Sequence, residues 1–506
     1  MSSLDVQRAR PTHSQVGTAF FFWLTGAGVL LLFAPLIVFT PWYISTGISA
    51  SLMLGIILLF KPTPGMYLLI FLVPITSFSV GFVPVSPWNY IIFYRYADKF
   101  SLLTPLVPLT VLGVLFVKLT RLRNINFRDP LLLTSIILVC YAALSLSWSA
   151  NLGHSIFELH RLLINVLLYL TVVSLIDSEK KYRTAMWIWI ISMLIQSILA
   201  VLLFAYKSVD ELYQITPTFL FHFKIFGGML LKTGTPNTAS GLQDFHETSL
   251  LTNMAAAVSF GILTDIKNRK KFILVSLFIS FFLFISMRTE SRAGIGSMLV
   301  MLVLLALMIP SLKYRRFRMT VIFMFSAASI YIISHIYIAT MTEVTQKPRM
   351  LVIIEEILGG GKLIDTGHKK KESGRMYMYE RSFHALFSHN PLLGLGIGNL
   401  KYLVQLPHAH SLYFSLVLDF GLIGIFFLAI LAKVLTQKLY NIVRMPDNPA
   451  RTMALASTAG LIGASVHCLA DFEYNYTSLW LFLGFVMASY NIANDQQKVP
   501  GTAAAQ

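Results

Sequence analysis

Apolar runs of about 20 residues recur from one end of this chain to the other, and they restrict its fold more than any other feature. A helix of about 20 residues crosses a hydrocarbon core of roughly 30 Å, because each helical residue adds about 1.5 Å. Only 12% of the residues are charged and 56% are hydrophobic, with a mean hydropathy of +0.69. Runs of this length argue against the short alternating strands of a barrel. The sequence therefore predicts an all-α, polytopic membrane protein.

About 14 runs are long enough to be transmembrane helices, and they are expected to form a single integral membrane domain over residues 1–506. The predicted spans lie near 16–39, 42–60, 66–84, 102–119, 130–149, 157–176, 184–206, 247–264, 271–287, 293–311, 318–339, 409–433, 453–470 and 475–493. They divide into N-terminal helices, central helices with one long loop, a second long loop, and C-terminal helices, at 16–119, 130–339 with 207–246, 340–408 and 409–494.

The Lys and Arg residues indicate which side of the membrane each connection occupies. If the N-terminus is cytoplasmic, 23 of the 40 Lys and Arg residues fall on the cytoplasmic side and 17 on the other. Nine of those 17 belong to loop 340–408, and long loops are largely exempt from the positive-inside rule. We therefore expect both termini in the cytoplasm and loops 207–246 and 340–408 on the exterior. The net charge of +17 reports topology rather than nucleic-acid binding, because the basic residues form no continuous patch.

The second half of the long loop has the pattern of a short helix. Apolar residues stand at helical spacing between Arg375 and Phe387, at Met376, Tyr379, Phe383 and Leu386. This spacing predicts an amphipathic helix lying on the exterior membrane surface. The alternative is an ordinary solvated linker.

Five arginines are not explained by topology. Arg288 and Arg292 border a tight exterior turn, Arg161 is placed about one turn inside an exterior helix end, and Arg375 and Arg381 flank the predicted surface helix. An arginine in or near hydrocarbon costs at least about 2.5–3.5 kcal/mol, so such residues tend to face cavities or partners. Its guanidinium suits bidentate phosphate recognition. Several arginines with few nearby carboxylates would suit a pyrophosphate, whereas snorkelling to lipid headgroups is the alternative for each.

Histidines mark the start of predicted span 409–433. His410 lies in its first turn, and His408 lies two residues earlier, about 200° away on a helix, which disfavours a shared metal. No other metal-ligand spacing occurs, so neither a metal nor a cofactor is expected. A neutral imidazole could accept a proton from a hydroxyl, or His410 could merely cap the helix. His467 and Asp471 form a second pair, for which a structural role is favoured.

Four stretches together resemble the bacterial O-antigen ligase/polymerase superfamily, which comprises membrane glycosyltransferases of the GT-C type. The first has a Trp-Ser segment followed by a helix with an arginine. The second begins a helix with Ser-Arg-Ala, the third combines an arginine, an amphipathic helix and Pro-x-x-Gly-x-Gly, and the fourth begins with histidine. They are "LSLSWSANLGHSIFELHRLL" (144–163), "MRTESRAGIGS" (287–297), "SGRMYMYERSFHALFSHNPLLGLGIGNL" (373–400) and "HAHSLYFSLVLDFGLIG" (408–424).

The resemblance places Arg292 and Arg375 on the two family arginines and His410 on the family histidine. It departs from the pattern at Ser411, where Asn is common, and at Asp419, where Glu is common. Asp419 lies about 13 Å beyond His410 along a helix, so we expect it to pack within the bundle rather than to pair with that histidine. In the same stretch, Gly421 and Gly424 are expected to allow close helix contact.

The resemblance implies transfer of a glycan from undecaprenyl pyrophosphate to an acceptor hydroxyl at the periplasmic face of the bacterial inner membrane, without metal and with inversion. Arg292 and Arg375 would bind the pyrophosphate, and His410 would act on the acceptor hydroxyl. The other substrate-binding candidates are Arg161, Arg288, Arg381, His408, Gly394, Gly396 and Gly398. The implied partners are the lipid-linked donor, a lipid-linked repeat or lipid A–core as acceptor, membrane lipids and a chain-length regulator, with no nucleic acid.

Three functions fit this pattern. About 14 spans, 506 residues and two large exterior loops resemble the polymerases, which extend the glycan on another lipid-linked repeat. The ligases, which transfer the glycan to lipid A–core, tend to be shorter, and protein O-glycosylating relatives also exist. A lipid-linked oligosaccharide flippase is the alternative from another class. It predicts an internal repeat, which the sequence does not display, and it does not need the long exterior loop.

Overall fold

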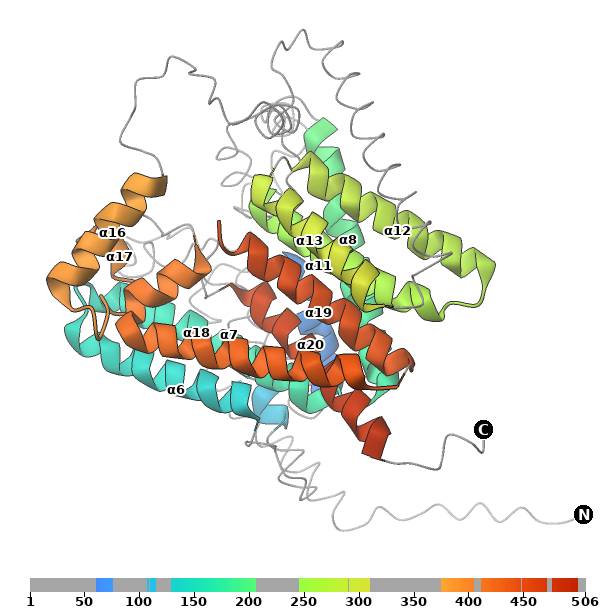
Figure 1. The fold of residues 1–506 in the computed structure, drawn as a ribbon, viewed down its shortest axis with the longest axis horizontal. Helices are drawn as coiled ribbons and strands as arrows, with labels where there is room; N and C mark the ends of the chain where they lie inside the picture. The colour runs from blue at the N-terminus through green and yellow to red at the C-terminus, as the bar shows by residue number, and fades with distance from the viewer. Residues whose placement is uncertain are drawn as a thin grey trace, which may run out of the picture.

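The computed structural model of the chain is helical throughout the part that it describes (Figure 1). The described residues are 61–75, 107–108, 110–114, 129–205, 245–289, 291–309, 375–404, 411–446, 448–470 and 476–498. The helices are α3 (Pro62–Leu72), η1 (Val73–Ile75), α6 (Pro130–Leu144), η3 (Ser145–Trp148), α7 (Leu152–Leu175), α8 (Glu179–Ala205), α11 (Phe245–Asp265), α12 (Arg269–Arg288), α13 (Arg292–Met308), α16 (Arg375–His389), α17 (Leu400–Leu403), α18 (Leu412–Arg444), α19 (Pro449–His467) and α20 (Thr477–Lys498).

Five helices in the described part of the chain are long and apolar enough to cross a membrane. They cover Pro130–Trp148, Leu152–Leu175, Glu179–Val201, Arg269–Arg288 and Leu412–Arg444. The prediction of an all-helical, multi-pass membrane protein is thereby confirmed. Predicted spans 16–39, 42–60 and 318–339 lie outside the described residues, and so does most of 102–119. The total of about 14 spans therefore stays a prediction.

Helices α11 and α19 lie at the centre of the bundle and are covered by other helices. Helix α11 packs against α8, α12, α13 and α19, while α19 also contacts α13, α18 and α20. Small residues bring the two central helices together: a Cβ atom on Gly261 would stand 2.9 Å from Cβ of Ala456, and one on Gly460 would stand 2.9 Å from Cβ of Ala257. Close contact through small residues is typical of packing between membrane helices.

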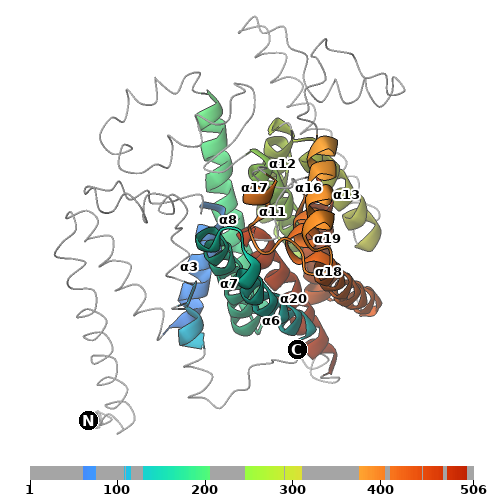
Figure 2. The ribbon, with the colours of Figure 1, turned by 90° about the vertical axis from the view of Figure 1, so that its left-hand side faces the viewer.

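The remaining helices surround this pair. Helix α7 packs against α6 and α20, and α3 packs against α7 and α8 (Figure 2). A buried aromatic cluster joins α8 to α20, with Trp189 in an edge-to-face contact with Phe485, their ring centroids 6.0 Å apart. Aromatic pairs in this geometry add to the stabilisation that comes from burial alone.

The bundle has two ends that differ in chemistry. At the end where α8, α12 and α19 begin, Lys267, Arg269, Lys270 and Lys271 are exposed. We call this the basic end, and it is the end predicted to be cytoplasmic. The opposite end, where α7, α13 and α18 begin, carries α16, α17 and the segment between them (Figure 1). We call it the loop end.

Candidate active site

The glycine-rich segment 390–399 lies against a break in α18. Gly421 interrupts that helix with φ 58° and ψ −141°. At the break, the Leu395 N–H donates to the carbonyl of Leu418 at 2.8 Å, and the Gly396 N–H donates to the carbonyl of Asp419 at 2.9 Å. These bonds satisfy carbonyls that the broken helix leaves without an internal donor, which is the condition for irregular backbone at membrane depth.

Glycine is required where the segment and the break in α18 meet. Gly394 has φ 80°, and a Cβ atom on it would overlap the carbonyl oxygen of Asp419. A Cβ atom on Gly421 would stand 2.5 Å from the carbonyl oxygen of Leu392. The expectation that Gly421 permits contact between helices is therefore wrong, because it permits the glycine-rich segment to approach α18 instead.

Of the other two glycines of the run, Gly396 faces the α6–α7 turn and Gly398 faces the first turns of α7. A Cβ atom on Gly396 would stand 3.2 Å from Nε1 of Trp148, and one on Gly398 would stand 2.9 Å from Cγ of Glu158. All three glycines of the run thus have a packing role, whereas their approach to a donor stays a prediction.

Asn399 fastens this segment to the turn between α6 and α7. Its buried Oδ1 accepts hydrogen bonds from the Ser149 hydroxyl at 3.1 Å, the Ala150 N–H at 3.0 Å and the Asn151 N–H at 3.3 Å. The Ser155 hydroxyl donates to the carbonyl of Ile397 at 2.6 Å. Sequence reasoning missed Asn399, although it directly follows the glycine run.

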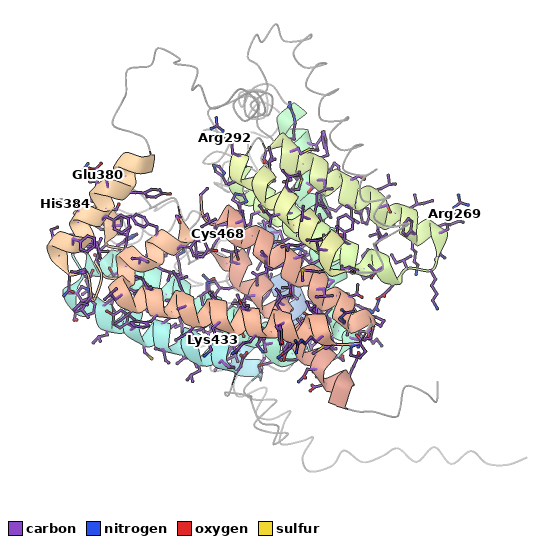
Figure 3. All side chains as sticks on the ribbon, viewed as in Figure 1. Arg269, Arg292, Glu380, His384, Lys433 and Cys468 are labelled. Atoms are coloured by element: carbon purple, nitrogen blue, oxygen red, sulfur yellow. The ribbon has the colours of Figure 1, made fainter. Side chains whose placement is uncertain are left out.

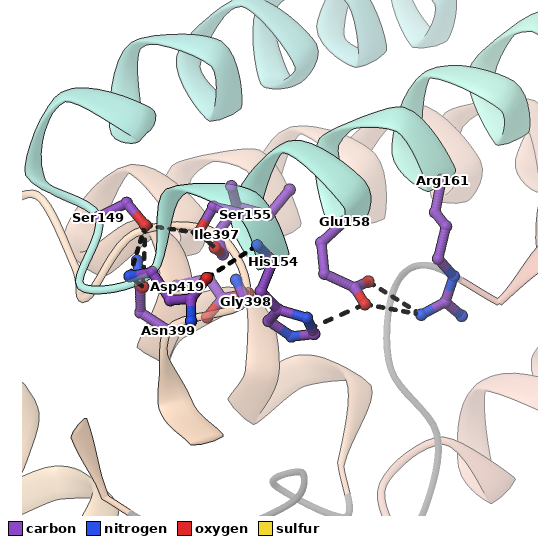
Figure 4. Close-up of polar contacts among 10 residues, drawn as sticks. Ser149, His154, Ser155, Glu158, Arg161, Ile397, Gly398, Asn399 and Asp419 are labelled. Atoms are coloured by element: carbon purple, nitrogen blue, oxygen red, sulfur yellow. Dashed lines mark hydrogen bonds and ion pairs between the residues drawn. The ribbon is translucent and has the colours of Figure 1, made fainter. Parts of the chain in front are cut away.

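A polar row runs along one face of α7 beneath the segment (Figure 4). It contains His154, Glu158 and Arg161, at spacings of four and three residues that place them on one helix face. Nη1 of Arg161 donates to Oε2 of Glu158 at 2.9 Å and to Oε1 at 3.1 Å. Nε2 of His154 lies 4.0 Å from Oε1 of Glu158.

The position of Arg161 differs from the sequence prediction. Asn151 caps α7 by accepting from the N–H of His154, so the helix begins at Leu152 and Arg161 is its tenth residue. Arg161 therefore lies roughly 13 Å from the start of the helix rather than one turn inside. Arg161 also has a carboxylate close by, because Glu158 is an ion-pair partner.

Arg288 and Arg292 lie at the loop end, where α12 ends and α13 begins. Arg288 is buried, with 3% of its surface exposed, whereas Arg292 is exposed. Ser291 caps α13 by accepting from the Gly294 N–H at 3.1 Å. Figure 3 shows Arg292 at the opposite end of the α12–α13 pair from Arg269.

Two histidines, the half-buried His246 and the buried His467, connect this cap to the start of α18. Nδ1 of His246 lies 2.9 Å from the hydroxyl oxygen of Ser291. The rings of His246 and His467 meet edge to face with centroids 6.3 Å apart. The Leu412 N–H then donates to the carbonyl of Cys468 at 3.0 Å, next to His467. The start of α18 and the start of α13 are therefore linked through α11 and α19.

The predicted surface helix is present as α16. Its residues Tyr379 and Phe383 both contact Phe414 of α18 edge to face, at centroid distances of 4.8 and 4.5 Å. Leu386 is buried, whereas Phe387 and Arg381 are exposed. The amphipathic helix is confirmed, with its apolar face packed partly on α18. Its placement on a membrane surface stays a prediction.

Four predicted residues fall where side chains are not described. Arg375 is the first residue of α16, but its side chain lies outside the described part. His408 and His410 lie between Val404 and Ser411, outside the described residues. Asp471, which follows Ala470, is also outside them. Ser411 is the N-cap of α18, with its hydroxyl accepting from the Phe414 N–H at 3.5 Å. The roles of Arg375, His408 and His410 stay predictions.

Asp419 lies where α18 meets the glycine-rich segment. Its carboxylate accepts a hydrogen bond from the Gly398 N–H at 3.3 Å, and the residue is buried. It thus holds the glycine-rich segment, in agreement with the expected packing role. Among the residues that the structure describes, no group of three or more His, Cys, Asp or Glu residues could hold a metal ion.

Comparison with known protein families adds one finding. A family model described as O-antigen ligase matches residues 274–429. This stretch includes most of α12, all of α13 and α16, the glycine-rich segment and the break in α18. No curated protein matches the chain. The match confirms the resemblance to the O-antigen ligase/polymerase superfamily.

Proposed function

We propose that this O-antigen ligase/polymerase-like membrane enzyme is a polysaccharide polymerase of the bacterial inner membrane. It would transfer a glycan from undecaprenyl pyrophosphate to a hydroxyl of another lipid-linked repeat at the periplasmic face. The observation that carries the proposal is the family match over residues 274–429, the stretch that contains Arg292, Arg375 and His410.

The proposed reaction is a single displacement at the anomeric carbon. The acceptor oxygen forms a bond to that carbon while the bond to the pyrophosphate oxygen breaks, which inverts the configuration. His410 takes the proton from the acceptor hydroxyl, an effect worth about 10²–10⁴ in rate where general-base catalysis operates. Undecaprenyl pyrophosphate leaves with the electron pair of the broken bond.

The arginines would serve the leaving group. Negative charge grows on the pyrophosphate as its bond to the sugar breaks, and fixed cations lower the energy of that transition state. We assign this work to Arg292 and Arg375, with Arg161, Arg288 and Arg381 as further contacts to the donor. Exposure of Arg292 at the start of α13 supports its availability, and the positive end of that helix adds to its effect on an anion.

Polymerase is preferred over ligase on the length of the chain and its expected number of spans. The ligase alternative is favoured by the description of the matching family, which names an O-antigen ligase. It would use the same residues and differ in its acceptor, lipid A–core.

One assay separates these functions. The purified full chain is incubated with a lipid-linked repeat as the sole substrate. We expect a ladder of products that differ by one repeat unit. Growth only after lipid A–core is added would identify a ligase. Movement of the intact substrate across proteoliposomes, with no new glycosidic bond, would overturn the enzyme proposal in favour of a flippase.

A further inference from the structure

Glu158 is a buried carboxylate that the proposed reaction does not yet use. Its side chain is 8% exposed, and both of its oxygens accept hydrogen bonds from Nη1 of Arg161. Removing a cation from such a buried pair is strongly destabilising, because the carboxylate is left without compensation. Glu158 and Arg161 are therefore expected to act as a unit.

The two members of the pair differ in exposure. The Arg161 side chain is 37% exposed, against 8% for Glu158. Both hydrogen bonds to Glu158 use Nη1 of the guanidinium, so the pair tethers Arg161 by that nitrogen and restricts the orientations that the side chain can adopt. A guanidinium held in one orientation loses less conformational freedom when it binds an anion.

The position of Glu158 is itself fixed from two sides. The backbone of Gly398 packs against its Cγ, where a Cβ atom would come within 2.9 Å. Gly398 is held in turn by its N–H bond to Asp419 of α18 at 3.3 Å. On the other side, Nε2 of His154 lies 4.0 Å from the carboxylate. Figure 4 shows His154 next to Gly398 and Asp419, with Glu158 and then Arg161 following along α7.

We propose that Glu158 is a positioning residue that holds the Arg161 guanidinium in the orientation in which it binds the pyrophosphate of the lipid-linked donor. The inference deepens the proposed function, since it names how one donor contact is set. Glu158 lies outside the matched family segment 274–429 and is assigned from its contacts alone.

The test is a double-mutant cycle on the full chain. The variants are Glu158→Gln, Arg161→Ala and the double variant, with Glu158→Asp as the conservative change. Glu179→Gln is the matched control, because Glu179 also pairs with an arginine within its helix, at 2.7 Å, at the basic end of the bundle. For each purified protein we measure binding of undecaprenyl pyrophosphate, transfer kinetics and thermal stability.

Glu158→Gln should weaken binding of undecaprenyl pyrophosphate and raise the donor KM by about 10- to 100-fold, as expected for a hydrogen bond to a charged group. Its effect on kcat should be smaller. Glu158→Asp should recover part of the affinity, and Glu179→Gln should leave it unchanged. In the Arg161→Ala background, Glu158→Gln should weaken donor binding no further, because residues that act as one unit are not additive.

Several results would overturn the inference. These are full additivity of the two changes, tighter binding by Glu158→Gln, or lower thermal stability with unchanged donor KM. Equal weakening toward undecaprenyl pyrophosphate and phosphatidylglycerol vesicles would instead make Arg161 a headgroup contact. Binding and transfer are separate readouts, so the proposed function can fail alone: a wild-type chain that binds undecaprenyl pyrophosphate but forms no polymer refutes the polymerase without refuting the role of Glu158. Failure of the wild-type chain to bind that lipid refutes both.

Discussion

Two glutamate–arginine pairs at opposite ends of the bundle have the same chemistry and different surroundings. At the basic end, Nη2 of Arg183 lies 2.7 Å from Glu179 of its own helix and 2.6 Å from Asp265 of α11. The side chains there are between 20% and 33% exposed. At the loop end, Arg161 pairs with Glu158 of its own helix, and that carboxylate is 8% exposed.

The difference shows which pair ties helices together and which is set beneath a candidate site. Arg183 joins α8 to α11 and is matched by two carboxylates, and the Gln496 amide adds α20 by donating to Glu179 at 3.2 Å. Partly exposed pairs of this kind contribute only about 0.2–1 kcal/mol each. Glu158 pairs with Arg161 within α7, and it lies under a glycine-rich segment that a side chain would displace.

Gly421→Ala should have the largest effect, and it should be confined to the loop end. Its φ of 58° and its contacts with Leu392 and Gly394 leave no room for a methyl group. We expect about 1–3 kcal/mol of backbone strain and a further cost of about 1–3 kcal/mol from overpacking. Transfer activity should be lost. Hydrogen exchange should show loss of protection in residues 412–420, while the start of α8 is unaffected.

Gly296→Ala is the control for that change. A Cβ atom on Gly296 would meet nothing within 4 Å, so alanine fits this position in α13. Because alanine is the better helix former, stability should be equal or higher by about 0.5–1 kcal/mol. Loss of hydrogen-exchange protection at both the loop end and the basic end in both variants would show that the two ends unfold as one cooperative unit. The proposed difference between the ends would then be wrong.

His410→Ala should lower the transfer rate by about 10²–10⁴ if this residue accepts the acceptor proton. The measurement is the initial rate of product-ladder formation at saturating donor. His384→Ala, which changes an exposed histidine on α16, should retain the wild-type rate. Full activity of His410→Ala with intact membrane insertion would refute the proposed role of His410 as the general base.

Asn399→Ala should destabilise the junction between the glycine-rich segment and the α6–α7 turn. It would remove the acceptor for the N–H groups of Ala150 and Asn151, which lie in a partly buried turn, and losing such a hydrogen bond costs about 0.5–1.5 kcal/mol. The expected result is a lower thermal midpoint together with reduced activity. An unchanged midpoint would contradict the anchoring role of Asn399.

Asp265→Asn should have the smallest effect, because it weakens a partly exposed pair at the basic end. We expect the free energy of unfolding to fall by at most about 1 kcal/mol, and this difference should be smaller at high salt. The donor KM should not change. Thermal unfolding at low and high salt measures the first effect and transfer kinetics the second. A rise in donor KM would show that the basic end is coupled to the site.

Much of the helical framework could be predicted from the sequence, because long apolar runs and helical spacing are local signals. The runs at 130–149 and 271–287 correspond to α6 with η3 and to α12, and the spacing of Tyr379, Phe383 and Leu386 indicated α16. The start of α7 was placed five residues too late, since Asn151 caps a helix whose first turns carry His154 and Glu158.

The sequence by itself determined a polytopic helical membrane protein and a family resemblance, because apolar runs and short motifs can be read locally; three of the four stretches that carry the resemblance lie within the matched residues 274–429. Only the tertiary structure decided what the glycines and Glu158 contact. Gly421 could be read as a helix-packing residue until its φ and its contacts with the segment 390–399 were known. The physical reason is that a buried carboxylate or a left-handed glycine takes its meaning from groups brought close by folding, such as Gly398 beside Glu158, which are separated by 240 residues in the chain.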